Sequence, residues 1–484
     1  MSTYARSFKL ALPQELIDKV VDETKDDFSG LKALSLVGTQ WSQRTRKHMF
    51  KEIRLMEQLH HPLDSKTRCR RLLELLEAND RLRKHPQTLV IQSSTSYEES
   101  SELEPGWLQV CSDNVIEVLS MLRNVNVVIL QQGAMRMNFS HLSFPLRAAL
   151  HSFISRPEII DLTLSGIDCM ELIPLVQHPS LKNLSIGPLV APPAEIDAHL
   201  PLNICQIPFN KNDSTTAFTS RRKKKSLRKL SVCGPGTAFC LLLAAAKDSQ
   251  ATLGFHRITT LEIGTLYFDF VMVLLWQPFL HYCCKNVERY SVTPGPVLPP
   301  SSDVPNGIPP LHPSIFSLDR LPKLKHLEIR VPYYYLPFPQ HDPIPHLLEA
   351  LENLSSPHSS DAQSVSLQTL NFGIDFANLD IKSESVDVTG VLDEISRRQD
   401  IWGRLDEILS RRHVFSQLTI VNFHMLLGVW CKFRQSLEEL DGLSNTIHSY
   451  MPNLGEQIEL TVAFHIPAST VSSAMSSLPV RPPQ

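Results

Sequence analysis

The chain has 484 residues, of which 42% are hydrophobic and 20% are charged, and its formal net charge at pH 7 is -3. This length exceeds that of one compact core, so it predicts a small module joined to a larger domain, or an elongated array. The near-balance of charges excludes an attraction of the whole molecule to nucleic acid or to anionic membranes.

The cysteines and the apolar stretches indicate the compartment. The nine cysteines are scattered without a C-x-x-C pair, which argues against a disulfide framework and against a zinc ribbon. The first residues lack a signal-peptide core, and the longest apolar stretches, 239-FCLLLAAA and 270-FVMVLLW, fall short of the roughly 20 residues that span a bilayer. We therefore expect a cytoplasmic or nuclear protein that does not enter a membrane.

Residues 12–55 predict three short helices followed by an extended end at 52–55. Pro13 suits a helix start, and an apolar face recurs at helical spacing through Leu16 and Val20. Asp27 offers a cap for the second helix, and Gly38 separates it from the third. A unit of this size buries little surface alone, so its apolar residues need a partner in the rest of the chain or in another protein.

The order of residues in this segment resembles an F-box. The resemblance rests on Leu12-Pro13-x-Glu15-Leu16, on Leu34-Ser35-Leu36-Val37 and on Trp41, and it extends through Phe50-x-x-Ile53-x-Leu55. F-boxes bind the Skp adaptor of cullin–RING ubiquitin ligases. The resemblance implies that the adaptor is bound by the residues that match the motif, namely Leu12, Pro13, Leu16, Val20, Leu31, Leu34, Val37 and Trp41.

Two positions depart from the F-box pattern. The family usually has Cys and then a basic residue after Val37, whereas this chain has Gly38 and Thr39. The alternative interpretation is that the three helices form only a small cap, with the same apolar residues packed against the larger domain.

A short phrase recurs beyond residue 120. Four close copies are 181-LKNLSI, 227-LRKLSV, 324-LKHLEI and 367-LQTLNF, and looser copies are 125-VNVVIL, 159-IIDLTL, 258-ITTLEI, 287-VERYSV and 418-LTIVNF. Each ends in a predicted strand whose alternate residues share one face, and the spacing between copies leaves room for a helix and a loop. Stacked strand–helix units bury a continuous core, which is the logic of leucine-rich repeats.

We therefore predict an α/β fold in which a three-helix F-box is followed by an irregular solenoid similar to leucine-rich repeats. The Asn or Cys that usually follows the strand of a regular repeat is missing, so the array is expected to be irregular; the alternative is a single larger α/β domain. The expected organisation is an F-box-like module at 1–55, a connecting helix at 56–86 that includes 64-DSKTRCRRLLELLEANDRL, a recognition domain at 87–466 that begins with the strand 88-TLVI, and a disordered tail at 467–484.

Several interruptions separate the repeated phrases. Residues 293–314 predict an exposed proline-rich loop, and 391-VLDEISRRQDIWGRLDEILSRR predicts a helical insertion. The segment 333-YYYLPFPQHDPIPH places three tyrosines after a strand, where they form either a ligand-contact patch or a loop packed on its own domain. A basic run after residue 220 is either a nuclear-import signal or a solvated loop, and it comprises Arg221, Arg222, Lys223, Lys224 and Lys225.

The sequence carries no motif of a known catalytic site. It contains no phosphate loop, no H-E-x-x-H, no G-x-S-x-G and no G-x-G-x-x-G. His60-His61 and Cys283-Cys284 have no second ligand pair at a useful spacing, so neither a metal nor a cofactor is expected.

The resemblance implies a non-enzymatic receptor of a Skp–cullin–F-box ubiquitin ligase, which binds the adaptor at one end and an unknown target protein at the other. The alternatives are a repeat scaffold for protein interactions outside the ubiquitin system, and a nucleic-acid binder that uses the basic run. Neither nucleic acid nor a membrane is the expected partner.

Overall fold

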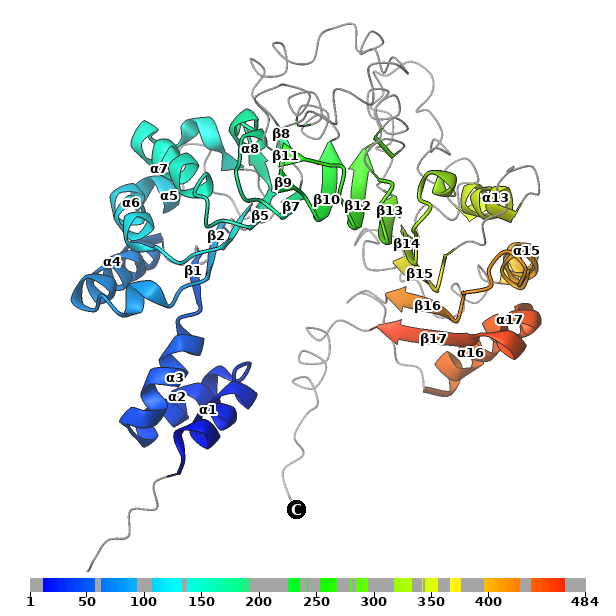
Figure 1. Ribbon diagram of the computed structural model, residues 1–484, viewed down its shortest axis with the longest axis horizontal. Helices are drawn as coiled ribbons and strands as arrows, with labels where there is room; N and C mark the ends of the chain where they lie inside the picture. Colours follow the sequence, from blue (N-terminus) through cyan, green and yellow to red (C-terminus); the bar gives the residue numbers. More distant parts are fainter. Residues whose placement is uncertain are drawn as a thin grey trace, which may run out of the picture. The chain divides into compact units, whose positions relative to one another are not determined.

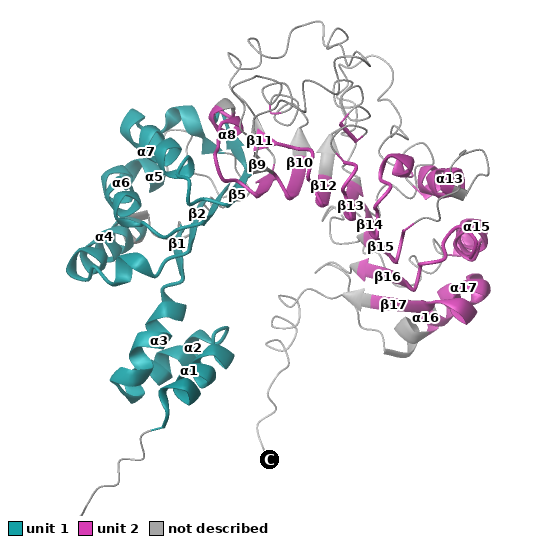
Figure 2. Ribbon diagram, viewed as in Figure 1, with its two compact units in different colours: residues 1–170 teal, residues 171–484 magenta. Residues whose placement is uncertain are grey.

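A computed structural model describes most of the chain in two compact units, residues 1–170 and 171–484 (Figure 2). The described residues are 12–56, 62–93, 107–132, 137–187, 189–190, 225–235, 242, 253–267, 279–280, 284–294, 317–332, 342, 344–355, 366–375, 396–426 and 437–465. Both units are α/β and contain parallel strands (Figure 1).

Unit 1 begins with the three predicted helices, α1 (Gln14–Glu23), α2 (Phe28–Val37) and α3 (Thr39–Met49) (Figure 1). The carbonyl of Pro13 accepts the first hydrogen bonds of α1, from the N–H groups of Leu16 and Ile17. The carboxylate of Asp27 accepts a hydrogen bond of 3.0 Å from Gly30 N and so caps α2, as predicted. Gly38 has extended backbone angles, which end α2 and let α3 begin at the next residue.

The rest of unit 1 alternates strands and helices. The strands β1 (Glu52–Met56), β2 (Thr88–Ser93), β3 (Val127–Gln132) and β5 (Asp161–Ser165) pair in parallel in chain order. Between them run α4 (Pro62–Ala78), the 3-10 turn η1 (Leu82–Lys84), α5 (Trp107–Val110), α6 (Ser112–Met121), η2 (Phe139–His141) and α7 (Phe144–Ile154). Parallel neighbours need such crossovers, which is why the pattern is a βαβ succession. Two short strands, β4 (Met137–Asn138) and β6 (Ile167–Asp168), form a separate parallel pair.

Unit 2 continues the same succession. After α8 (Ile173–Val176), its parallel strands are β7 (Asn183–Ile186), β10 (Lys229–Pro235), β12 (Thr260–Tyr267), β13 (Arg289–Pro294), β14 (His326–Pro332), β15 (Thr369–Asp375), β16 (Ile420–Leu426) and β17 (Glu459–His465). The other elements are the two-residue strands β8 (Leu189–Val190), β9 (Lys225–Ser226) and β11 (Leu253–Gly254), the turn η5 (Leu318–Arg320), and the helices α13 (Ile344–Ser355), α15 (Gln399–Leu409), α16 (Leu437–Tyr450) and α17 (Pro452–Gln457).

The repeated phrase accounts for this architecture. All nine copies begin a strand at their third residue, and in every copy the first, fourth and sixth residues are at most 3% exposed. Within each unit, the third residues of neighbouring copies also face each other in register, as Arg289 faces His326 and His326 faces Thr369. The phrase is therefore a structural repeat, in which one apolar pattern places each strand beside the next.

Backbone hydrogen bonds fix the same register at the strand starts. The carbonyl of the residue before one strand accepts the N–H groups of two residues of the next phrase; for example, Arg228 O accepts from Thr259 N at 2.8 Å and from Thr260 N at 3.1 Å. The arrangement recurs at the carbonyls of Lys51, Gln87, Asn126, Lys182, Thr259, Glu288, Lys325 and Gln368.

One boundary and the role of one helix differ from the sequence-based expectation. The first strand is β1 and not the strand at residue 88, because Ile53 and Leu55 are buried and β1 pairs with β2 along its whole length. The expected boundary at residue 55 therefore falls inside a strand. The helix predicted as an insertion after residue 391 includes α15, which buries Trp402 between Phe372 and Phe423, so it belongs to the core of unit 2.

Several sequence-based expectations lie outside the described residues. These are the basic run at 221–224, almost all of the proline-rich stretch, the tyrosines at 333–335 and the tail from 467. The backbone of Lys225 is described as the start of β9, but its side chain is not.

Candidate adaptor-binding surface

The three amino-terminal helices have a closed core of their own. Ile17 and Val21 from α1 and Leu31 from α2 are at most 2% exposed, and Thr45 of α3 is fully buried. The Thr45 hydroxyl donates a hydrogen bond of 2.9 Å to Trp41 O, which satisfies it within α3. The core is thus built from one row of α1, at the i and i+4 positions, and from the faces of α2 and α3 that meet it.

A second row of α1 stays open to solvent. Leu12 is 53% exposed, Leu16 is 50% exposed and Val20 is 47% exposed. Leu16 and Val20 lie four positions apart, so they follow one line along α1, next to the buried row of Ile17 and Val21, and Leu12 lies two residues before the helix. Leu12 and two turns of α1 therefore present apolar side chains that no described part of the chain covers.

The second helix adds apolar surface at its two ends. Phe28 is exposed at the start of α2, and Leu36 and Val37 are exposed at its end. Leu34 and Trp41 are half-buried, so parts of both side chains remain accessible. We call the exposed apolar residues of α1 and α2, together with Leu12 just before α1, the apolar surface; it consists of Leu12, Leu16, Val20, Phe28, Leu36 and Val37.

Seven of the eight predicted contact residues are exposed or half-buried, and one is buried. Leu12, Pro13, Leu16, Val20 and Val37 are exposed, and Leu34 and Trp41 are half-buried. Leu31 is buried, so its side chain supports the helices from inside and offers no surface to a partner. Phe28 and Leu36 were missed by the sequence reasoning. The spacing gave no signal for Leu36: consecutive helix residues point in different directions, so with Val37 as the predicted contact Leu36 was expected to face elsewhere, yet both are exposed.

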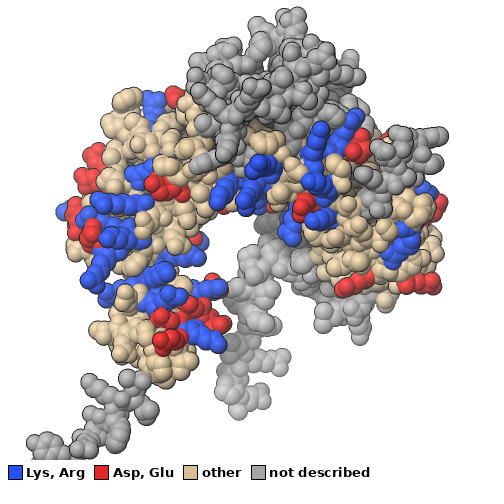
Figure 3. All heavy atoms as spheres, in the orientation of Figure 1, with Lys and Arg blue, Asp and Glu red and all other residues tan. Residues whose placement is uncertain are grey.

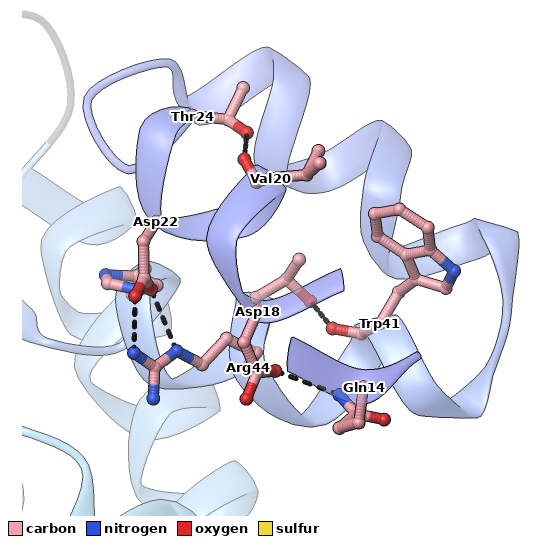
Figure 4. A network of polar contacts seen from close by, with 9 residues as sticks. Gln14, Asp18, Val20, Asp22, Thr24, Trp41 and Arg44 are labelled. Atoms are coloured by element: carbon pink, nitrogen blue, oxygen red, sulfur yellow. Dashed lines mark hydrogen bonds and ion pairs between the residues drawn. The ribbon is translucent and has the colours of Figure 1, made fainter. Parts of the chain in front are cut away.

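A polar network joins α1 to α3 (Figure 4). The guanidinium of Arg44 donates two hydrogen bonds to the carboxylate of Asp22, at 2.8 and 2.6 Å, and His48 Nε2 lies 2.7 Å from Asp22 Oδ1. A two-pronged contact of this kind fixes the relative orientation of its partners. The network therefore sets the angle at which α1 presents its open row.

The same contacts change the acidity of Asp22. Hydrogen bonds from Arg44 and then from His48 hold the pKa of Asp22 well below its usual range, and the carboxylate in turn raises the pKa of Arg44. The charged form of Asp22 is thus the one that the helix trio stabilises.

The junction of α2 and α3 has room for a Cβ at Gly38, the position at which F-boxes usually carry a cysteine. A Cβ built on Gly38 would lie 3.9 Å from its nearest neighbour, Trp41 Cδ1, which is an ordinary van der Waals contact. The φ angle of Gly38 is 171°, an extended conformation that any residue adopts. The departure at this position therefore removes a side chain without imposing a special backbone.

The described part of the chain holds no group of three or more His, Cys, Asp or Glu residues that could bind a metal ion. Cys284 is buried, and its neighbour in sequence together with His60-His61 lies outside the described residues. Among the described helices none combines the length and the apolar character that crossing a membrane requires.

Comparisons with known proteins add little. No family model matches the chain, and no curated protein is significantly similar to it in sequence. A crystal structure of a protein from Bacteroides fragilis aligns with 81% of this chain and 69% of its own, at 12% sequence identity and a TM-score of 0.26. A score of that size carries no argument about fold or function.

Proposed function

We propose that the chain is the substrate receptor of a Skp–cullin–F-box ubiquitin ligase, and that the apolar surface of α1 and α2 binds the Skp adaptor. The observation that carries the proposal is the open row of Leu12, Leu16 and Val20 on a helix trio whose own core is already closed. Contiguous apolar side chains that remain exposed mark interaction sites. Three of these residues are also positions at which the sequence matches the F-box motif.

The energy of such a contact is sufficient for a specific complex. Burial of each large apolar side chain contributes roughly 1.5–3 kcal/mol before the costs of association. Trp41, half-buried at the start of α3, is of the residue type that often dominates an interface. A surface that includes Leu16, Val20 and Trp41 therefore suits a stable adaptor complex.

The repeated strands are the part of the chain to which we assign binding of the target protein. We infer that they form an irregular solenoid similar to leucine-rich repeats, with strand–helix units stacked in chain order, and that this array holds the target protein. Nine phrases with one register support this inference. The receptor then contributes to ubiquitin transfer by position alone, because tethering raises the effective concentration of a target lysine near the ubiquitin-charged enzyme.

Co-purification of the full chain with a Skp-type adaptor and cullin tests the proposal. The decisive variant is Leu16→Asp with Val20→Asp, which places two carboxylates on the open row. We expect it to weaken adaptor binding by at least about 100-fold, because two buried apolar contacts are lost. Phe144→Asp is the matched control, since Phe144 is 75% exposed on α7 and lies outside the apolar surface.

Circular dichroism of all three proteins checks that they fold. Adaptor binding by the double variant at the level of the unchanged chain would refute the interface. So would an equal loss in Phe144→Asp, because the effect would then have no relation to the apolar surface. Both outcomes would favour a repeat scaffold outside the ubiquitin system.

Gly38→Cys provides an independent test, because it adds the residue that the family pattern has instead of removing an apolar contact. A Cβ at the junction meets only Trp41 Cδ1, at 3.9 Å, and replacing glycine there reduces the freedom of the unfolded chain. We expect unchanged folding and adaptor affinity that is equal or greater. A marked loss of affinity would show that the adaptor, if bound, approaches α2 and α3 differently from the family pattern.

A further inference from the structure

Lysine and arginine side chains gather on one stretch of unit 2, at strands β7, β10, β12, β13 and β14 (Figure 3). The basic residues come from the strands and from the residues just before them: Lys182, Arg228, Lys229, Arg257, Lys285, Arg289, Lys323, Lys325 and Arg330. We call this set the basic surface. Because the whole chain has a formal net charge of -3, this local excess is not a property of the overall composition.

The repeat explains how these residues come together. The third and fifth residues of each phrase lie on the face of the strand that the buried residues leave free. Register pairing places Lys229 opposite Thr260, Thr260 opposite Arg289, and Arg289 opposite His326. One row across four strands thus carries two full positive charges, separated by a threonine and followed by a histidine.

Acidic residues neutralise only part of the basic surface. Ion pairs join Lys229 to Glu262 at 2.7 Å, Lys325 to Glu288 at 3.2 Å and Arg330 to Glu328 at 2.6 Å, and these six residues form the paired part. By contrast, Arg228, Arg257 and Arg289 are exposed, and among the described residues none of them has an ion-pair partner.

Burial and the positive charges of the basic surface lower the pKa of His326. Burial lowers its pKa first, and the positive charges of Arg289 and Lys325 lower it further, against the opposing effect of Glu288. The positive charges of Arg289 and Lys325 therefore reach His326, and a ligand that brings negative charge to this row would be attracted to them.

We propose that the basic surface binds an acidic segment of the target polypeptide in an extended conformation, running across the strands. The proposal rests on the proposed function in that this polypeptide would be the protein delivered for ubiquitination. Lys229 and Arg289 lie two strands apart, roughly 10 Å at the usual strand spacing. An extended chain in the polyproline II conformation covers that distance in about three residues, which is also the period at which its side chains return to the same face. Acidic side chains three residues apart therefore match the surface.

Two features favour a polypeptide over a nucleic acid. Glu262, Glu288 and Glu328 lie among the cations; a peptide can place uncharged residues beside them, whereas a nucleic acid carries a phosphate at every nucleotide. Among the residues of these strands whose side chains are described, no Phe, Tyr or Trp is exposed to stack on a base, since Tyr290 is buried.

Fluorescence polarisation with the full chain tests the proposal without the adaptor. The probe is a labelled peptide of about twelve residues with Glu at every third position and Ser or Gly elsewhere, long enough when extended to cross these five strands. The first comparison peptide has Gln in place of Glu. The second comparison is a single-stranded oligothymidylate of similar charge.

The variant is Arg228→Glu with Arg289→Glu, and its matched control is Arg68→Glu with Arg123→Glu, two exposed arginines of unit 1. Both variants change the net charge equally. We expect the Glu peptide to bind the unchanged chain with an affinity that falls as salt rises, and to bind the first variant at least about tenfold more weakly. The control variant should keep its affinity within about twofold.

Three results would overturn the proposal: equal binding of the Gln peptide, an equal loss in both variants, or tighter binding of oligothymidylate than of the Glu peptide. The last result would assign the surface to nucleic acid. Adaptor binding is measured separately through Leu16 and Val20, so a chain that binds the Glu peptide but no adaptor would refute the ligase function and leave the acidic-segment site standing.

Discussion

The helix trio and the strands of unit 2 use the same apolar residue types in opposite ways. In the repeated phrase every first, fourth and sixth residue is at most 3% exposed. In α1, a leucine and a valine of equal apolar character remain about half exposed beside a closed core. The comparison teaches that an apolar pattern identifies an element reliably, whereas only the three-dimensional arrangement shows which of its residues are left for a partner.

The largest effect should come from the aromatic cluster of unit 2. Trp402 lies 5.8 Å from both Phe372 and Phe423, measured between ring centroids, and it is 2% exposed. We expect Trp402→Ala to destabilise unit 2 by about 3–5 kcal/mol, because a large cavity remains. Hydrogen exchange of β15 and β16 would measure the loss. A change below about 1 kcal/mol would contradict the burial of this helix in the core.

Within the helix trio, Leu31 and Leu16 allow a buried leucine to be compared with an exposed one. Leu31→Ala should destabilise the trio by about 2–5 kcal/mol, since Leu31 is 2% exposed. Leu16→Ala should change stability by less than about 1 kcal/mol but weaken adaptor binding, since Leu16 is 50% exposed. Hydrogen exchange in α1–α3 and adaptor affinity, measured on both variants, would separate the two roles. Equal stability losses would mean that Leu16 is also part of the core.

A smaller effect is expected at the start of α2. Asp27→Ala removes the side chain that accepts a hydrogen bond of 3.0 Å from Gly30 N, and it should cost about 0.5–2 kcal/mol. Asp27→Asn keeps an acceptor and serves as the control. Helical content and hydrogen exchange of α2 report the difference, and identical behaviour of the two variants would contradict the cap.

The smallest effect should appear as a dependence on pH. The folded pKa of Asp22 lies below that of the unfolded chain, about 3.9, so at acid pH the unfolded state binds the proton first. The stabilisation is therefore complete above the unfolded pKa and is lost as pH falls toward the folded pKa. Asp22→Asn should flatten this acid dependence in the exchange of α1 and α3. An unchanged profile would show that the contact with Arg44 contributes nothing in solution.

The fold was predictable from sequence where one pattern determined both local structure and burial. The four copies of L-x-x-L-x-[IVF] and the five looser copies located nine strands, and the first, fourth and sixth positions are buried in each. Phe50-x-x-Ile53-x-Leu55 has the same spacing, yet its place after the helix trio made it resemble the end of the module and not the first strand. The pattern fails at β17, where the exposed Gln457 stands in the first position.

The candidate surfaces were less predictable. The motif identified the helix trio and five exposed residues, but spacing alone could not separate the buried Leu31 from the exposed Leu16. The basic surface was not found at all. Its members come from five phrases far apart in the sequence, and only the register of the strands makes Arg289 a neighbour of His326.

The paired hydrogen bonds at the strand starts keep the strands aligned when the chain between them gains or loses residues. Each strand is anchored at its first residues, as when Glu288 O accepts from Lys325 N and His326 N, both at 2.9 Å. Alignment is therefore set locally and does not depend on how much chain lies between one anchor and the next. Because closing a longer connection costs little free energy, insertions and deletions between strands can accumulate during evolution while the spacing of side chains across the sheet is preserved.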